Sequence, residues 1–133
     1  MNVFRSFLEV KNALQEGKAS CVDITANYLS RISEYNSLNV FIEVFDKEAL
    51  TRAKAIDIKI KNGTAGKLAG MVVGLKDNIC YKDHKVSAAS KILKGFESLY
   101  SATSTQRLLE EDAIIIGRLN CDEFAMGLSL IHI

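Results

Sequence analysis

The sequence predicts an α/β fold built around two parallel strands. Residues 71–75 and 113–117 are short runs, almost wholly apolar and rich in β-branched residues, as buried strands are. Between them, residues 103–111 follow a helical pattern. A strand, a helix and a second strand at this spacing form a βαβ unit, in which the strands are parallel and the crossover is right-handed. Three amphipathic patterns precede the unit, so we expect N-terminal helices beside the sheet.

The first part of the chain predicts two helices and a short strand. Residues 3–16 carry apolar residues at mostly helical spacing, and a glycine follows as a stop. Ser20 and Asp23 form a capping box that opens a second helix, which runs to about Tyr35. Residues 39–45 are rich in strand-forming side chains. The side of the second helix that we expect to be buried consists of Val22, Ile24, Ala26, Tyr28, Leu29 and Ile32.

A third helix is predicted after Asp46, which is placed to cap it. Its apolar stripe is expected to be Ala49, Leu50, Ala53, Ala55, Ile56 and Ile60. Its solvated side is expected to be Lys47, Glu48, Arg52, Lys54, Asp57, Lys59 and Lys61. Residues 62–70 then hold three glycines, but they precede a strand and lack the spacing of a phosphate-binding loop, so they predict only a turn.

The stretch from residue 77 to residue 100 is polar and predicts no regular element. Thr103 or Ser101 is expected to cap the helix of the βαβ unit. The second strand ends in Arg118–Asn120, and a last helix is expected from Asp122-Glu123. Two adjacent carboxylates on a helix point in different directions, so they suit a helix N-terminus better than an acid–base pair.

Composition excludes several classes of protein. A length of 133 residues is enough for one domain with a core, and a net charge of +1 implies no strong field toward nucleic acid or membrane. No apolar run approaches the roughly 20 residues that cross a bilayer, and the N-terminus lacks the pattern of a secretory signal. The three cysteines (Cys21, Cys80 and Cys121) match no metal-site spacing. We therefore expect reduced thiols, a cytoplasmic location and no bound metal.

Lys76 is the sharpest candidate for chemistry. It follows the first buried strand of the βαβ unit, and ligands of open α/β sheets bind at the carboxyl ends of strands. A lysine desolvated at such a position can lose its proton near neutral pH and act as a general base, or as part of a Ser–Lys nucleophilic pair. The alternative, a lysine that only reaches solvent from a strand end, is more common for this residue type.

Three neighbours of Lys76 carry weaker indications. Asp77 is placed to pair with Lys76, as a structural contact. His84, among charged residues, is expected to be a solvated loop residue, and Cys80 a small buried filler.

Blocks of sequence around Lys76 resemble the amidase signature family. Residues 68–78 (LAGMVVGLKDN) resemble the LxGxPxxxKDN block of that family, and residues 89–93 (ASKIL) resemble its next block. Residues 102–103, 107–108, 113–117 and 120–127 continue the resemblance in the family's order and spacing. ASKIL together with DEFAMG (residues 122–127) is most similar to the glutaminase subunits of tRNA-dependent amidotransferases.

The resemblance implies a fold and a reaction. The fold is a mixed β-sheet core flanked by helices, and the enzymes use a Ser–cis-Ser–Lys triad. The matching lysine is Lys76, whose implied role is to take a proton from the bridging serine as a neutral amine. The implied protein is a glutamine-hydrolysing carbon–nitrogen ligase subunit that passes ammonia to its partner subunits. These use ATP and magnesium to amidate misacylated Glu-tRNA(Gln) or Asp-tRNA(Asn), and this segment itself is expected to bind no cofactor.

Two departures from the family pattern affect that expectation. Val72-Val73 stands where the family usually has a proline-containing stretch. The family continues after DEFAMG with a glycine- and serine-rich region holding both catalytic serines, whereas this chain continues only with residues 128–133 (LSLIHI). LSLIHI is also the translation of one frame of a sequencing-transposon end, so we expect residues 1–127 to be the N-terminal portion of an amidase domain and 128–133 to be non-native. We expect this fragment to be inactive and marginally stable.

Two other interpretations remain open at this point. The first is an amidase-signature hydrolase that acts on small amides without partner subunits. The second is a non-catalytic α/β module that binds a partner through its N-terminal helices, with Lys76 purely structural.

Overall fold

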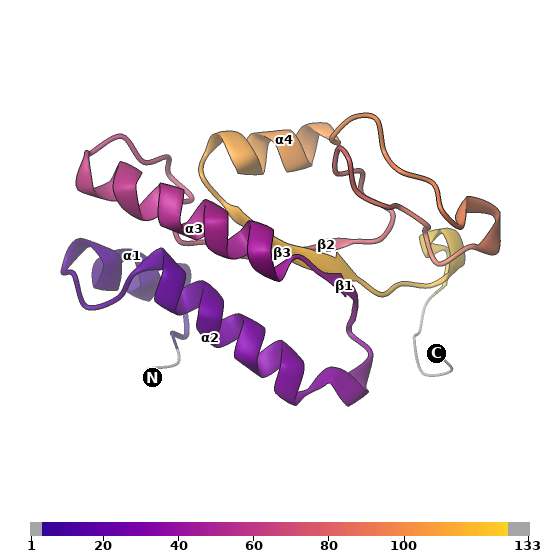
Figure 1. The fold of residues 1–133 in the computed structure, drawn as a ribbon, viewed down its shortest axis with the longest axis horizontal. Helices are drawn as coiled ribbons and strands as arrows, with labels where there is room; N and C mark the ends of the chain where they lie inside the picture. The colour runs from indigo at the N-terminus through magenta and orange to yellow at the C-terminus, as the bar shows by residue number, and fades with distance from the viewer. Residues whose placement is uncertain (1–3, 128–133) are drawn as a thin grey trace.

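A computed structural model describes residues 4–127 as a three-stranded mixed sheet with helices on both faces (Figure 1). The helices are α1 (Phe7–Gln15), α2 (Cys21–Glu34), α3 (Asp46–Lys61) and α4 (Thr103–Glu110), and the strands are β1 (Phe41–Val44), β2 (Val72–Lys76) and β3 (Ile114–Leu119). Short 3-10 turns lie at Asn36–Leu38, Lys91–Leu93 and Glu123–Ala125. The predicted α/β class, with N-terminal helices ahead of a mixed sheet, is confirmed.

The sheet has the order β1-β3-β2, with β3 at its centre. β2 and β3 are parallel, with Lys76 opposite Leu119, which confirms the strands of the predicted βαβ unit. β1 joins β3 antiparallel and makes the sheet mixed. β3 is buried almost throughout, whereas only Leu75 of β2 is fully buried. The expectation of a buried first strand is therefore wrong for most of β2, because β2 has a neighbour on one side only among the described strands.

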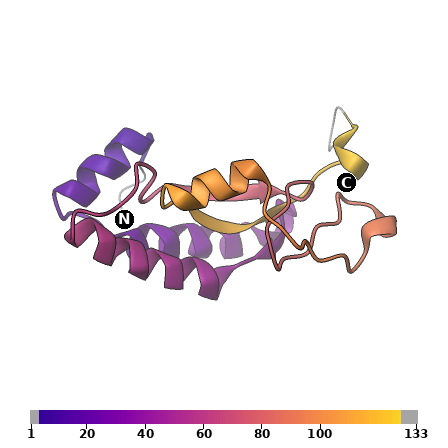
Figure 2. The same cartoon turned by 90° about the horizontal axis from the view of Figure 1, so that it is seen from above.

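Alternate residues of β3 build two separate cores. Ile114 and Ile116 pack with Ala53 and Ile56 of α3 and with Cys21 of α2. Ile115 points to the other face, where it packs with Leu75 and Phe45 and, at the margin, with Leu109 of α4. This alternation is the two-residue period of a strand. Seen from above, α2 and α3 lie together on one side of the sheet (Figure 2).

The caps of the first two helices follow the sequence closely. Ser6 caps α1, which therefore begins at Phe7, four residues later than expected. Ser20 and Asp23 form the predicted capping box of α2. Of the predicted buried side of α2, Ala26 and Tyr28 are exposed. The fully buried positions are Cys21, Ile24 and Thr25, of which Ile24 was predicted. The predicted Val22, Leu29 and Ile32 are partly buried against the core.

The expectation that the charged side of α3 is solvated is wrong for Arg52 and Asp57, which are partly buried. Arg52 donates to the carbonyls of Leu109 and Ala113, each at 2.6 Å. Asp57 accepts hydrogen bonds from the backbone of Cys21 at 2.7 Å and of Val22 at 3.2 Å. It thus satisfies two of the free N–H groups at the start of α2. Burial, and then the charge of Asp57, raise the pKa of the Cys21 thiol to about 12, so this cysteine stays protonated.

Lys59 is exposed, as expected, and binds Asp112 in the turn between α4 and β3. The Lys59 Nζ lies 2.7 Å from Asp112 Oδ1, and Asp112 Oδ2 accepts from the Gly66 backbone at 2.8 Å. Burial would raise the pKa of Asp112. The Lys59 and Gly66 hydrogen bonds and the nearby charges of Lys59 and Arg52 oppose burial, and on balance the pKa lies below its usual value.

Three expected helix boundaries are corrected. Phe45, without a side-chain hydrogen bond, precedes α3, and Asp46 is its first residue. Ala102 precedes α4, so neither Thr103 nor Ser101 caps it. Asp122-Glu123 begins a 3-10 turn with a positive φ at Phe124, and no helix forms there within the described residues. Ser101 instead accepts a hydrogen bond from the Lys82 backbone, so a long-range contact uses the side chain that a cap would need.

A first prediction concerns the glycine pair Gly74 and Gly117, which lie opposite each other in β2 and β3. A Cβ at position 117 would collide with the backbone oxygen of Glu43 and lie 2.9 Å from the Phe41 ring. Gly117→Ala should therefore cost about 2–3 kcal/mol in the free energy of unfolding, because β1 must move. At position 74 the nearest atoms belong to the Leu119 side chain at 3.0 Å, which can rotate away. Gly74→Ala should cost less than about 1 kcal/mol, and equal costs in urea denaturation would contradict this packing.

A second prediction concerns pH. Because the folded pKa of Asp112 is lowered, its contribution to stability is present above the ordinary carboxyl pKa and is lost as pH falls through the folded pKa. Asp112→Asn should cost about 1–2 kcal/mol at pH 7, and the gap to the unmodified chain should shrink below about pH 4. Urea denaturation at pH 7, 5, 4 and 3 measures the gap, and a gap independent of pH would show that the charge is not what stabilises this turn.

Candidate active site

The carboxyl ends of β2 and β3 lie side by side, as the βαβ prediction requires. Lys76 ends β2 opposite Leu119, and the backbone of Asp77 donates to the Leu119 carbonyl at 3.0 Å. The Lys76 side chain is exposed. The predicted position at a strand end is therefore confirmed, but the expected desolvation is not provided by the part of the chain that is described.

The sequence suggested that Asp77 pairs with Lys76, but in the structure it does not. Its side chain is fully buried and forms an ion pair with Arg118 of β3. The side chain of Arg118 is itself 8% exposed, and its guanidinium also binds Glu43 of β1, at 3.0 and 3.1 Å. One arginine thus joins β1, its own strand and the residue that follows β2. A buried carboxylate requires such a partner, because an unpaired charge away from water is very costly.

Asp77 also orders the loop that follows it. The Ser87 hydroxyl and backbone and the Ala89 backbone all donate to the Asp77 carboxylate, and the Ala88 backbone donates to the Asp77 carbonyl at 2.9 Å. Ala88 and Ala89 have φ values of +46° and +53°, a region that non-glycine residues seldom adopt. The hydrogen bonds to Asp77 compensate for that backbone conformation and fix the loop beside Lys76.

Ser90, in the same small-residue cluster, reaches a different partner. Its hydroxyl donates to Glu123 at 2.8 Å, and its side chain is buried. The backbone of Phe124 donates to the Ala88 carbonyl at 2.8 Å. The segment after β3 is therefore hydrogen-bonded to the loop after β2, and the two segments that follow the strand ends are held together.

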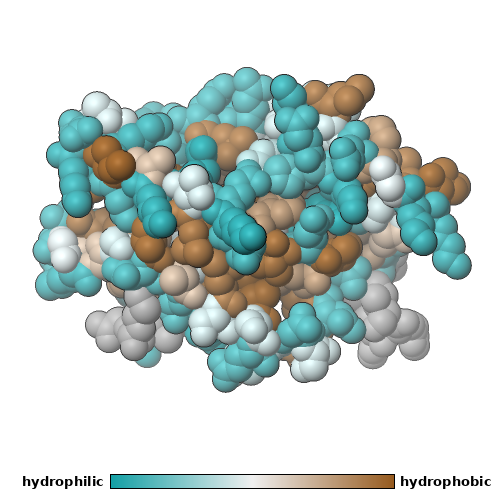
Figure 3. All heavy atoms as spheres, in the orientation of Figure 1, coloured by the Kyte–Doolittle hydropathy of each residue, from teal (hydrophilic) through white to brown (hydrophobic). Residues whose placement is uncertain are grey.

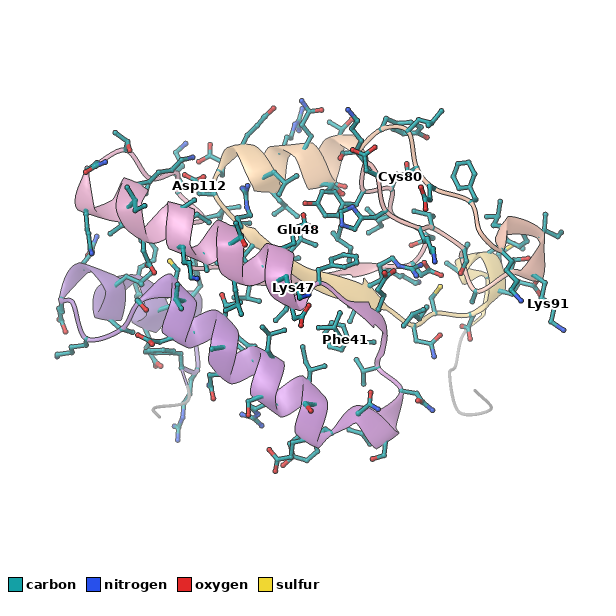
Figure 4. The ribbon with its side chains drawn as sticks, viewed as in Figure 1. Phe41, Lys47, Glu48, Cys80, Lys91 and Asp112 are labelled. Atoms are coloured by element: carbon teal, nitrogen blue, oxygen red, sulfur yellow. The ribbon has the colours of Figure 1, made fainter. Side chains whose placement is uncertain are left out.

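His84 is not the solvated loop residue that was expected. Its side chain is 17% exposed and stacks on Tyr81, with ring centroids 4.0 Å apart and planes 8° apart. Its Nε2 lies 2.8 Å from Glu48 Oε2, on the side of α3 that faces this loop (Figure 4). The Tyr81 hydroxyl donates to the other oxygen of Glu48. Sequence reasoning missed this because Glu48 lies 36 residues before His84.

The three cysteines are free thiols, as predicted. Cys80 is half-buried, and its carbonyl accepts from Thr105 at 3.1 Å and from Ala102 at 2.9 Å. Cys121 is buried after β3, and burial, followed by the charge of Asp77, raises its pKa. The raised pKa disfavours the thiolate form of Cys121, which a nucleophilic role would need.

Two further features of the described residues bear on other kinds of site, namely metal ligands and an apolar groove. In residues 4–127 no three His, Cys, Asp or Glu side chains are grouped to hold a metal ion, and no helix in that range is long and apolar enough to cross a membrane. An apolar groove of about 280 Å³ lies between α2 and the sheet. It is lined mainly by Tyr28, Ile32, Leu38, Phe41, Val72 and Ile116. Figure 3 shows hydrophobic side chains gathered along the centre of this face. Arg31 is its one ionisable group other than tyrosine, so it is poorly suited to acid–base chemistry.

The arrangement places the exposed amine of Lys76 at the end of β2, beside the buried Asp77. Lys76 can act as a cation, or as a base where it becomes desolvated. Arg118 and Glu43 are the supporting residues that sequence reasoning did not single out. One signal was available, because Arg118 interrupts an otherwise apolar strand and a buried arginine needs an acidic partner.

Comparison with known proteins identifies a family. A family model described as Amidase matches residues 23–132. The A subunit of glutamyl-tRNA(Gln) amidotransferase from Chlorobium phaeobacteroides (strain DSM 266 / SMG 266 / 2430) is 43% identical over 127 residues, which are 95% of this chain and 27% of that protein. The protein of the same name from Chlorobaculum tepidum is 44% identical over 95% of this chain and 26% of its own length. The chain thus spans about a quarter of the length of these relatives.

Solved structures agree with that identification. An amidase family protein from Bacillus anthracis str. Ames superposes with a TM-score of 0.85 at 29% identity, over 96% of this chain and 26% of that one. Native peptide amidase from Stenotrophomonas maltophilia gives a TM-score of 0.79 at 29% identity, over 86% of this chain and 24% of that one. The three-stranded sheet and its helices therefore correspond to part of a larger fold in each case.

A third prediction tests the buried ion pair. Arg118→Met leaves Asp77 buried without its countercharge, and should lower the free energy of unfolding by about 3–5 kcal/mol. Arg107→Met, at an exposed position on α4, should cost less than about 0.5 kcal/mol in the same urea denaturation. Adding Asp77→Leu to Arg118→Met should recover part of the loss, because the unpaired charge is removed. A double variant less stable than Arg118→Met would show that Asp77 contributes mainly through Ser87 and Ala89.

Proposed function

The chain belongs to the amidase family, and we propose that it supplies the N-terminal part of the glutamine-hydrolysing subunit of a tRNA-dependent amidotransferase. The observation that carries the proposal is the 40–44% identity, over at least 93% of the chain, to relatives named as the A subunit of glutamyl-tRNA(Gln) amidotransferase. The relatives' name favours Glu-tRNA(Gln) over Asp-tRNA(Asn) as the acceptor.

In this proposal Lys76 is the base of a Ser–cis-Ser–Lys triad. Its position at the end of β2 is held by the Asp77–Arg118 pair, which supports the proposal because a general base must be fixed in place relative to the group it deprotonates. The exposed amine must become desolvated before it can work as a neutral base at pH 7. We propose that polypeptide equivalent to the rest of the longer relatives provides both serines and that desolvation.

The proposed partners follow from the same assignment. The other amidotransferase subunits receive the ammonia, and the complex amidates misacylated tRNA in the cytoplasm with ATP and magnesium. Residues 1–133 alone are proposed to be inactive. It contributes one member of the triad, and such residues act together in a strongly non-additive way.

A second candidate is a hydrolase of small amides that works without partner subunits. It is favoured by the likeness to the peptide amidase structure, at a TM-score of 0.79. The two candidates differ in substrate and in dependence on other subunits, so one assay can separate them.

A fourth prediction tests the proposed function in a chimera. Residues 1–127 replace the matched segment of the Chlorobium phaeobacteroides relative, produced together with that organism's other amidotransferase subunits. The chimera should release ammonia from glutamine and amidate Glu-tRNA(Gln). Lys76→Met should lower glutamine hydrolysis by about 10³-fold or more, since the triad fails without its base.

The matched control is Lys54→Met, which changes an exposed lysine on α3. It should leave the rate within about twofold, as surface substitutions usually do. Activity toward small amides without partner subunits would favour the second candidate. A folded chimera in which Lys76→Met retains full activity would favour the non-catalytic module.

A further inference from the structure

We propose that the cluster of Phe45, Glu48, Tyr81 and His84 is a protonation-dependent tether that holds the loop after β2 against α3. The proposal does not depend on the proposed function, because it concerns contacts within residues 45–101 only. It predicts that this loop is attached to α3 while His84 is protonated and is released when His84 loses its proton.

The hydrogen-bonding partners of the ring support the protonated form. Nδ1 of His84 lies 2.8 Å from the carbonyl oxygen of Lys82, and Nε2 lies 2.8 Å from Glu48 Oε2. Both partners are acceptors, so each contact needs a proton on the ring nitrogen that makes it. A neutral imidazole has one N–H and would turn a lone pair toward the other acceptor, whereas the imidazolium donates to both.

The surroundings of the ring add to this preference. Tyr81 stacks on one side of His84, and the Phe45 ring lies 4.4 Å away at an angle of 59°. Aromatic faces attract cations. The Tyr81 hydroxyl donates to Glu48 Oε1, so Glu48 Oε2 is left for the contact with His84 Nε2.

Other charged groups lie on the elements around the ring, and none provides a second contact to it. On α3, Arg52 donates to the carbonyls of Leu109 and Ala113. On the loop, Lys82, Asp83 and Lys85 are exposed, and Glu97 lies opposite Lys85 in an isolated bridge. Glu48 is therefore the acidic group that contacts the His84 ring directly.

The tether holds a defined segment of the loop, whose two arms are joined by backbone hydrogen bonds. Asp83 donates to Ser98 at 2.8 Å, Ser98 to His84 at 2.9 Å, and Val86 to Phe96 at 3.1 Å. These bonds hold the two arms of the loop together, and the side chains of Tyr81 and His84 attach that unit to α3. Histidine is the side chain whose protonation is most readily changed around neutral pH, so pH is the variable that tests the attachment.

The fifth prediction is measured by amide hydrogen exchange on the 133-residue chain at pH 6 and pH 8.5, with rates corrected for intrinsic exchange. The amides of Asp83, Val86 and Ser98 should lose about tenfold in protection at pH 8.5, the effect of one charge-assisted hydrogen bond. The amides of Ala53 and Ile56 in α3 should keep their protection. A parallel loss in α3 would mean general unfolding and would overturn the proposal.

Variants separate the tether from other effects of pH. His84→Gln keeps a donor that does not titrate, and should abolish the pH-dependent loss. Glu48→Gln removes the partner charge on α3 and should reduce the loss to about twofold or less. The control Glu34→Gln, an exposed carboxylate at the end of α2, should behave as the unmodified chain. A loss in His84→Gln as large as in the unmodified chain would overturn the proposal, and Glu48→Gln provides the test if His84→Gln does not fold.

Discussion

The ion pair between Asp77 and Arg118 is the interaction on which the rest of the candidate site depends. Both side chains are buried, and each is satisfied by groups from other elements: Glu43 of β1 for the arginine, and the Ser87–Ala89 segment for the aspartate. A pair of this kind adds little net stability compared with apolar residues, but breaking it is expensive. Its effect is therefore to exclude other arrangements of the strand ends. Because Lys76 is covalently joined to Asp77, fixing the aspartate also fixes where the lysine leaves the sheet.

Charged residues on α3 likewise connect segments that are far apart in the sequence. Arg52, Asp57 and Lys59 connect α3 to the α4–β3 turn and to the start of α2, while Glu48 connects it to the loop after β2. In each case a charged side chain satisfies backbone groups or an opposite charge that would otherwise be unpaired near the core. One helix thus serves as the common attachment for segments far apart in the sequence. Its apolar stripe alone, mostly alanine, could bury only a modest area against β3.

Much of the fold was predictable, because its signals are local. The capping box at Ser20 and Asp23, the β-branched run of β3 and the order of strands and helices are properties of neighbouring residues, and all are confirmed. The errors fell where a distant contact competes with a local preference. Ser101 binds Lys82 instead of capping α4, and Phe124 adopts a positive φ in a turn attached to Ala88, where a helix was expected.

The position of the candidate site was also predictable, whereas its supporting contacts were not. The sequence by itself determined the family, the βαβ unit and Lys76 at a strand end, because blocks of adjacent residues carry those signals. The tertiary structure decided which charges are buried and with what they pair. Asp77 and Arg118 are 41 residues apart, and Glu43 and Arg118 are 75 apart. No periodicity or spacing relates such residues, since their proximity exists only once three strands have come together in one sheet.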